Sequence, residues 1–203
     1  MKIICIGQNY PEHAREMNAK TATDPIIFIK PETAYLKSEE PFFLPAFSNE
    51  IHYEVELVIK INRQGKNIHV NHAAKYYDEI TTGIDFTARD IQRKCKQAGH
   101  PWELAKGFDR SAAVGEFIPV ESLADRNSIP FHLEINRQTV QSGNYKDVTF
   151  SFEKIISFVS MYFMLKKGDL IFSGTPAGVG PVKLNDELIS FIGDKKLLTT
   201  RIK

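Results

Sequence analysis

Two glutamates with alternating spacing are the residues of this chain best suited to chemistry. Glu54 and Glu56 lie in residues 52–61, where the alternation places both carboxylates on one face of a strand, opposite an apolar face. Residues two apart on a strand have Cα atoms about 7 Å apart, so their two carboxylate groups can converge on one cation. Hard oxygen donors favour Mg²⁺, Mn²⁺ or Ca²⁺ over zinc. The same alternation also fits a half-solvated strand with its carboxylates in water. A third acidic residue near the two glutamates would favour the metal site over the solvated strand.

Asp85 offers this third ligand. Residues 83–92 are typical of a strand end that runs directly into a helix, with Thr87 as the N-cap and Asp90 completing a capping box. Asp85 then lies just before the cap, where a side chain at a strand terminus commonly faces a pocket. The alternative is a loop aspartate that accepts hydrogen bonds from nearby amides. Together with the two glutamates, Asp85 would give an octahedral cation three oxygens and leave positions for water or substrate.

Composition excludes several classes of protein. The chain has 203 residues, 42% hydrophobic and 25% charged, with a formal net charge of +1, which is ordinary for one globular domain over residues 1–203. Basic residues are scattered, and short patches such as residues 93–96 are best interpreted as a solvated face, so we expect no nucleic-acid partner. Without an apolar stretch of membrane-spanning length, and with only Cys5 and Cys95, we expect no membrane partner and a cytoplasmic location with free thiols.

Strands and short helices position these residues. Residues 1–7 and 26–29 have the pattern of buried strands, and a short helix follows Asn9. Because residues 18–24 are polar and small, we expect residues 8–24 to form a mobile lid. We predict that the helix after Thr87 ends at Gly99. The apolar positions of the later helix follow a period of about 3.6, and they are Ile155, Ile156, Phe158, Val159, Tyr162 and Phe163.

A glycine-rich loop at residues 174–181 follows the predicted strand at residues 170–173. Glycine permits close approach, so such a loop can present backbone amides to an anion. It lacks the Lys-Ser/Thr ending and the following helix of a phosphate-binding P-loop, which disfavours that interpretation. Strands at residues 188–191 and 197–202 complete the predicted pattern.

In the glutamate strand, the Asp85 segment and the glycine-rich loop, the chain resembles the fumarylacetoacetate hydrolase family, particularly its small acylpyruvase and oxaloacetate decarboxylase members. Six segments carry the resemblance in the family's order and span nearly the whole sequence. They are Gly7-Gln8-Asn9-Tyr10 through Met17, Phe28-Ile29-Lys30-Pro31, residues 52–57, residues 85–92, Pro101-Trp102-Glu103-Leu104-Ala105-Lys106, and Gly174-Thr175-Pro176.

The resemblance implies an α+β fold, a mixed β-sandwich roll with peripheral short helices, and a homodimer. It implies that Glu54, Glu56 and Asp85 bind Mg²⁺ or Mn²⁺, with Ca²⁺ as a further candidate. Lys106, which follows the strand-like residues 102–104, matches the family's active-site lysine, and His13 with Glu16 matches a lid dyad in which the acid orients the imidazole and the imidazole takes a proton from water. The residues that it assigns to substrate binding are Tyr10, Lys30, Arg89, Gln92, Gly174 and Thr175.

The expected activity is that of a metal-dependent enzyme acting on small 2-oxo acids through a metal-stabilised enolate. The two leading reactions are hydrolysis of the carbon–carbon bond of an acylpyruvate or fumarylpyruvate and decarboxylation of oxaloacetate. The alternatives are an isomerase or hydratase of 2-hydroxydienedioates or 2-oxopentenoates and a non-catalytic metabolite-binding dimer. One residue departs from the family, because Gln8 stands where arginine is frequent and a neutral amide loses a charged contact to a carboxylate. Lys30 is the residue expected to compensate.

Overall fold

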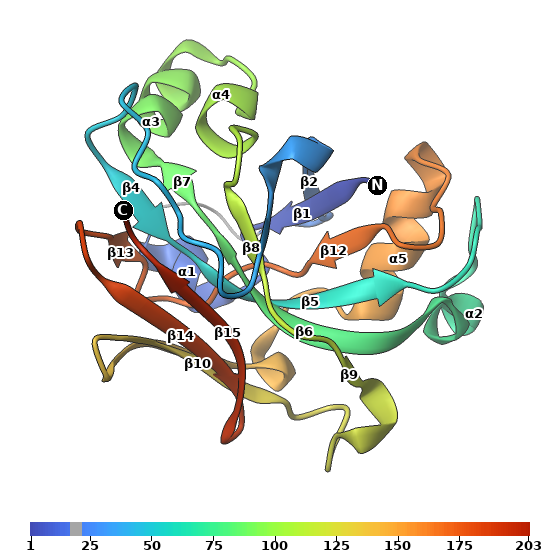
Figure 1. Ribbon diagram of the computed structural model, residues 1–203. Coiled ribbons are helices and arrows are strands. Elements are labelled where there is room, and N and C mark those ends of the chain that lie inside the picture. Colours follow the sequence, from blue (N-terminus) through green and yellow to red (C-terminus); the bar gives the residue numbers. More distant parts are fainter. Residues whose placement is uncertain (17–21) are drawn as a thin grey trace.

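The computed structural model describes residues 1–16 and 22–203 and shows a curled, eight-stranded sheet at the centre of an α+β fold (Figure 1). Seven of its strands follow the order β2-β1-β12-β5-β6-β8-β3, and β9 pairs with β6 outside that order. Its strands are β1 (Ile3–Gly7), β2 (Ile26–Lys30), β3 (Tyr35–Lys37), β5 (Val55–Ile61), β6 (Tyr77–Asp85), β8 (Ala112–Val114), β9 (Ile118–Pro119) and β12 (Leu170–Phe172). The central strands are buried on both faces, which explains why they are rich in isoleucine and valine.

Two smaller sheets complete the β-structure. The four-stranded sheet has the order β11-β10-β14-β15, with β10 (Pro130–Ile135), β11 (Gln138–Asn144), β14 (Glu187–Ile192) and β15 (Lys195–Arg201). The three-stranded sheet has the order β13-β4-β7, with β4 (Ile51–Tyr53), β7 (Thr87–Ala88) and β13 (Gly180–Pro181). The chain crosses from the three-stranded to the eight-stranded sheet at Glu54 and crosses back at Phe86.

Short helices lie around the sheets. The α-helices are α1 (Pro11–Glu16), α2 (Val70–Ala73), α3 (Arg89–Ala98), α4 (Glu103–Lys106) and α5 (Phe152–Tyr162), and the 3-10 turns are η1 (Glu32–Ala34), η2 (Ala74–Tyr76), η3 (Val120–Ser122) and η4 (Tyr145–Asp147). Helix α3 ends at Gly99, which has left-handed backbone angles, as the sequence predicts. Helix α5 is capped by Ser151, whose hydroxyl accepts a hydrogen bond from the Lys154 amide.

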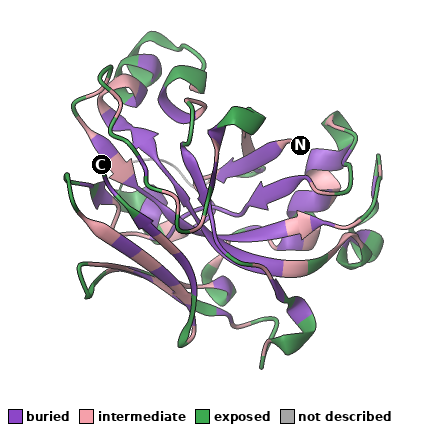
Figure 2. Cartoon of the chain, viewed as in Figure 1, coloured by how far each residue is buried: buried purple, intermediate pink, exposed green. Residues whose placement is uncertain are grey.

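The larger of two buried apolar clusters joins the curled sheet, the four-stranded sheet and helix α5, and Figure 2 shows the strands of the curled sheet mostly buried. Leu57 and Ile59 of β5 share one apolar cluster with Leu133 of β10 and Leu188 of β14. A buried hydrogen bond of 2.6 Å between the hydroxyls of Thr82 and Ser190 also joins the two sheets. The sandwich-like roll predicted from the resemblance is therefore confirmed.

Two local predictions are wrong. Thr87 is not a helix N-cap, because it pairs with His52 in the short strand β7 and its side chain turns toward the acidic cluster; Ala88 precedes the helix instead. Residues 103–106, which follow Trp102, form a helical turn rather than a strand, since all four are good helix formers and the Gly107 amide bonds to the Glu103 carbonyl. Residues 17–21 of the predicted lid lie outside the described residues, so the lid stays a prediction.

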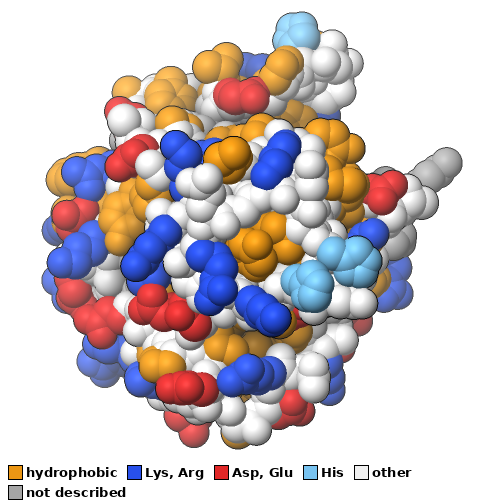
Figure 3. Space-filling view, turned by 90° about the vertical axis from the view of Figure 1, so that its right-hand side faces the viewer, with side chains coloured by type: hydrophobic (Ala, Val, Ile, Leu, Met, Phe, Trp, Pro, Cys, Tyr) orange, Lys and Arg blue, Asp and Glu red, His pale blue; other side chains and the backbone are white. Residues whose placement is uncertain are grey.

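The surface in Figure 3 carries basic, acidic and apolar side chains interspersed, as expected for a chain with a net charge of +1. Among the described residues, no helix is both long and apolar enough to span a membrane.

Candidate metal centre and active site

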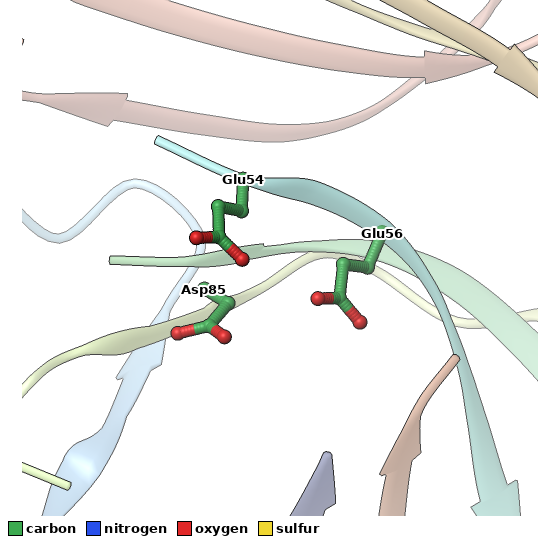
Figure 4. A group of neighbouring side chains, drawn as sticks. All are labelled: Glu54, Glu56 and Asp85. Carbon is green, nitrogen blue, oxygen red and sulfur yellow. The ribbon is translucent and has the colours of Figure 1, made fainter. Parts of the chain in front are cut away.

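Three buried carboxylates meet where the chain crosses between sheets. Val55 of β5 pairs with Ile84 of β6, and the Asp85 amide donates to the Glu54 carbonyl at 2.9 Å, so Asp85 lies beside Glu54 although 31 residues separate them. One carboxylate oxygen each of Glu54, Glu56 and Asp85 lies within 4.8 Å of the others. Figure 4 shows the three carboxylates directed into the same space. The sequence prediction that these acids converge therefore agrees with the geometry.

The three carboxylates differ in their partners. Glu54 accepts hydrogen bonds from Arg89 at 2.6 Å and Lys106 at 2.9 Å. Burial alone would raise the pKa of Glu54, but these two positive charges overcome it and hold the pKa well below its usual range. Glu56 accepts a hydrogen bond of 2.6 Å from the Gly174 amide. Burial, followed by the negative charges of Asp85 and Glu54, raises the pKa of Glu56 well above its usual value.

This donor set fits a hard divalent cation. Its three carboxylates come from two segments, are all buried, and have the oxygen chemistry that Mg²⁺ and Mn²⁺ prefer. Asp85 Oδ1 is buried and receives no hydrogen bond from the described residues, although Lys30 Nζ lies 2.7 Å away. A cation among the three groups would offset the repulsion that raises the pKa of Glu56. Glu54, Glu56 and Asp85 could therefore bind a divalent metal.

Two buried lysines support the acidic cluster from different sides. Lys106, at the end of α4, donates to Glu54, to Asp85 at 2.7 Å and to the Thr87 hydroxyl at 2.6 Å. Burial opposes its charge, but Asp85 and Glu54 raise the pKa of Lys106 above its usual value, so the ammonium is retained. Lys30 is completely buried; it pairs with Asp85 and donates to the carbonyls of Lys106 and Ser111. Lys30 therefore lies behind Asp85 and not in the cavity, which differs from its predicted place beside substrate.

Helix α3 places Arg89 and Gln92 against the same cluster. They are three residues apart, so they lie on one face of the helix, and Arg89 donates to Gln92 at 2.6 Å. Both side chains are buried and line the cavity that Glu54 and Glu56 also line. The structure therefore brings Arg89 and Gln92 to the cavity beside the carboxylates, and their contact with substrate stays a prediction.

His13 and Glu16 approach the cluster from α1. His13 Nδ1 lies 2.9 Å from a Glu16 carboxylate oxygen, and the other oxygen accepts a hydrogen bond of 3.1 Å from the Gly178 amide. Because Nδ1–H donates to the carboxylate, Nε2 of a neutral imidazole carries the free lone pair. His13 lines the cavity with Glu54 and Glu56. This pair has the geometry of an acid that orients a base.

The glycine-rich loop closes another side of the site. Gly174 has φ of 99°, and a Cβ there would lie 2.8 Å from the Asn9 Cβ, so glycine is required. The loop was predicted to present backbone amides to an anion, and the Gly174 amide donates its hydrogen bond to the carboxylate of Glu56. Thr175 lines the cavity, but its hydroxyl already bonds to the Val55 carbonyl and to Gln141. Tyr10, also predicted to bind substrate, is buried against Phe131 and is not part of the cavity lining.

The cavity bounded by these groups has a volume of about 30 Å³, enough for about two water molecules. Six lining residues were not assigned a site role from the sequence: Ile6, Gly7, Gln8, Phe28, Lys96 and Trp102. Arg93, Lys94 and Lys96 are exposed, as the interpretation of residues 93–96 as a solvated face predicts. Lys96 also lines the cavity, and its ammonium lies 5.5 Å from the centre of the Trp102 ring. Its spacing from Gln92 on one helical face is the signal that could have found it.

The fold thus brings a buried carboxylate cluster that could bind a divalent metal next to a lysine and a histidine–glutamate pair. The family described as "Fumarylacetoacetate (FAA) hydrolase C-terminal" matches residues 2–201. The mitochondrial oxaloacetate tautomerase FAHD1 of Mus musculus is 40% identical over 186 residues, which cover 92% of this chain and 84% of that protein. The chain belongs to the fumarylacetoacetate hydrolase family, and the predicted family, fold class and class of enzyme are confirmed.

Solved structures agree with this assignment. Fumarylpyruvate hydrolase from Pseudomonas aeruginosa, in complex with Mn²⁺ and pyruvate, has a TM-score of 0.94 and 31% identity, and the match covers 100% of this chain and 89% of that one. The 2-hydroxyhepta-2,4-diene-1,7-dioate isomerase from Mycobacterium marinum has a TM-score of 0.85 and 33% identity, covering 99% of this chain and 73% of that one.

Proposed function

We propose that this protein is a divalent-metal-dependent enzyme that hydrolyses the carbon–carbon bond of an acylpyruvate or fumarylpyruvate, decarboxylates oxaloacetate, or does both. The observation that carries the proposal is the convergence on one cavity of a buried carboxylate cluster, a charged lysine and an oriented histidine. The metal is Mg²⁺ or Mn²⁺, with Ca²⁺ as a further candidate, and the Mn²⁺ and pyruvate in the Pseudomonas aeruginosa relative support this choice. The homodimer and the cytoplasmic location remain predictions.

Glu54, Glu56 and Asp85 would hold the cation, which would supply positive charge beside the 2-oxo oxygen of the substrate, where enolate charge develops. Lys106 adds a second positive charge from the same cluster. Arg89 fixes the Glu54 carboxylate and aligns the Gln92 amide through its side-chain hydrogen bonds. These residues together favour the charge that builds up as a carbon–carbon bond breaks.

His13 is the proposed base for hydrolysis. Its Nε2 takes a proton from a water molecule, whose oxygen attacks the remote carbonyl of the acylpyruvate. When the carbon–carbon bond breaks, its electron pair stays on the pyruvate fragment, and the proton returned from His13 converts that fragment to pyruvate. Glu16 keeps the imidazole in the required tautomer, and the Gly178 amide holds Glu16 in place.

A 2-oxo acid is larger than the cavity, so we infer that lining side chains move outward when substrate binds. Gln8 and His13 both lie in the segment predicted to form a lid, residues 8–24, and are the lining residues that such a motion would carry. The lid is thus part of the proposal.

The proposal is tested by turnover of acetylpyruvate, fumarylpyruvate and oxaloacetate with Mg²⁺ or Mn²⁺, followed by addition of EDTA. We expect at least one of these substrates to be converted, the rate to fall by more than about 100-fold with the chelator, and excess Mg²⁺ to restore it, because the cation stabilises developing charge. Turnover that is unchanged by EDTA would reject the mechanism.

Proton transfer without bond cleavage is a second candidate function. It is supported by the tautomerase and isomerase names of the two relatives, and the same base could move a proton between carbon and the enol oxygen. Following the enol absorbance of oxaloacetate separately from pyruvate release distinguishes the two. Rapid loss of enol without pyruvate would favour tautomerisation over decarboxylation.

A further inference from the structure

A lysine that the metal centre does not use lies at the outer edge of the active-site cavity. Lys96 is four residues after Gln92 on α3, so the helix presents both side chains on one face. It lines the cavity yet remains exposed, whereas Glu54, Glu56 and Lys106, which line the same cavity, are buried. Lys96 therefore marks the solvent end of a cavity whose deep end is the carboxylate cluster.

The charge of Lys96 is not neutralised by the part of the chain that the structure describes. The charged groups that act on it are Arg89, Glu54 and Lys106, and Glu54 is already bonded to the other two. Burial, and then the positive charge of Arg89, lowers the pKa of Lys96. The ammonium rests over the Trp102 ring, 5.5 Å from its centre, which orients it without supplying an anion. An anion at this position would be stabilised.

The position of Lys96 determines which part of a substrate it can contact. A 2-oxo acid that reaches the cation with its carboxylate and 2-oxo group extends its other end away from the metal, toward solvent. There it would meet Lys96 and the neutral side chain of Gln8, which line the same cavity. Lys30, expected from the sequence to supply this charge, is buried behind Asp85 and cannot do so.

We propose that Lys96 binds the second carboxylate of a dicarboxylic 2-oxo acid and so makes the enzyme prefer dicarboxylic over monocarboxylic substrates. The inference rests on the proposed function, because it assumes that the 2-oxo end of the substrate lies at the carboxylate cluster. Gln8 can donate a neutral hydrogen bond to the same carboxylate, and Lys96 supplies the charge.

The test compares the KM and kcat of Lys96→Gln and Lys96→Arg with acetylpyruvate, which has one carboxylate, and with oxaloacetate and fumarylpyruvate, which have two. We expect Lys96→Gln to raise KM about tenfold or more for at least one dicarboxylate, since a charge-assisted hydrogen bond is lost. The KM for acetylpyruvate changes by a much smaller factor, and kcat changes little. Lys96→Arg retains most of the affinity. Lys94→Gln, at an exposed position on the same helix, is the matched control.

An equal effect of Lys96→Gln on all three substrates, or none on any, would overturn the role of Lys96 while leaving the proposed function intact. Absence of turnover by the wild-type protein with Mg²⁺ and with Mn²⁺ would instead reject the proposed function, and the assignment of Lys96 with it.

Discussion

Glu56 is the carboxylate of the acidic cluster that depends most on a cation. Glu54 has Arg89 and Lys106 as partners, and Asp85 has Lys30 and Lys106, whereas Glu56 has a backbone amide. A buried carboxylate next to two others is costly when ionised. The cluster therefore favours a bound cation, which makes Glu56 the most informative of the three positions to neutralise.

The role of His13 as the base can be tested by substitution. His13→Ala should lower kcat for hydrolysis of an acylpyruvate by about 10² to 10⁴, the usual contribution of a general base. Glu16→Gln should lower it less, because the base remains and only its orientation is weakened. Steady-state kinetics with acetylpyruvate measures both variants, and Glu12→Gln, exposed on the same helix, is the control. Full hydrolytic rate in His13→Ala would exclude His13 as the base that activates water.

Individual site residues could be predicted only where the local sequence pattern identifies them. The shared face of Glu54 and Glu56 follows from strand alternation, but the order of six segments was needed to assign Lys106. The resemblance assigned Lys30 to substrate binding, and the charge pattern assigned residues 93–96 to a solvated face. Only long-range packing puts Lys30 behind Asp85 and Lys96 at the edge of the cavity.

Strand β6 shows how elements fix the site. Gly83 pairs with Glu56 across β5 and β6, two residues before Asp85. A Cβ on Gly83 would lie 2.5 Å from a Phe172 ring carbon and 2.8 Å from Val58, so the close packing of β6 on its neighbours requires glycine there. The register that brings Asp85 to Glu54 is held by this packing.

Substitution of Gly83 tests that packing. Gly83→Ala should destabilise the protein by about 1–3 kcal/mol, because an extra methyl group in a filled core forces its neighbours to shift. Urea denaturation gives the change in the free energy of unfolding. Gly7→Ala is a matched control in β1, since its Cβ would meet neighbours at 3.6 Å or more, an ordinary contact. Equal stability of Gly83→Ala and wild type would show that the packing is looser than described.

Helices and strands could be predicted where the sequence pattern is periodic. The prediction was wrong where tertiary contacts determine the local structure. The C-terminal end of helix α3 follows from Gly99, and helix α5 follows from its apolar periodicity. Thr87 has the residue type of an N-cap, but its hydroxyl bonds to Glu54 and Lys106, which the local sequence cannot reveal. Strand β11 was missed because it is polar and exposed along much of its length.

At the scale of the molecule, the site lies where one chain changes sheets twice. Glu54 and Phe86 mark the two crossings, and the backbone hydrogen bond between Asp85 and Glu54 ties them together. Carboxylates from two segments can therefore meet at one buried position. Helices α1, α3 and α4 and the glycine-rich loop supply the remaining groups. The fold is thus the reason that residues distant in sequence form one acidic cluster.

The most direct test of this account is calorimetric titration of Mn²⁺ into the metal-free wild-type protein and into Glu56→Gln. The account predicts one Mn²⁺ per chain for the wild type and binding weakened by about 100-fold or more in Glu56→Gln, which loses a charged oxygen donor. The variant should remain folded, because glutamine can still accept the Gly174 hydrogen bond. Equal Mn²⁺ affinity in the two proteins, or no binding to the wild type, would contradict the central claim.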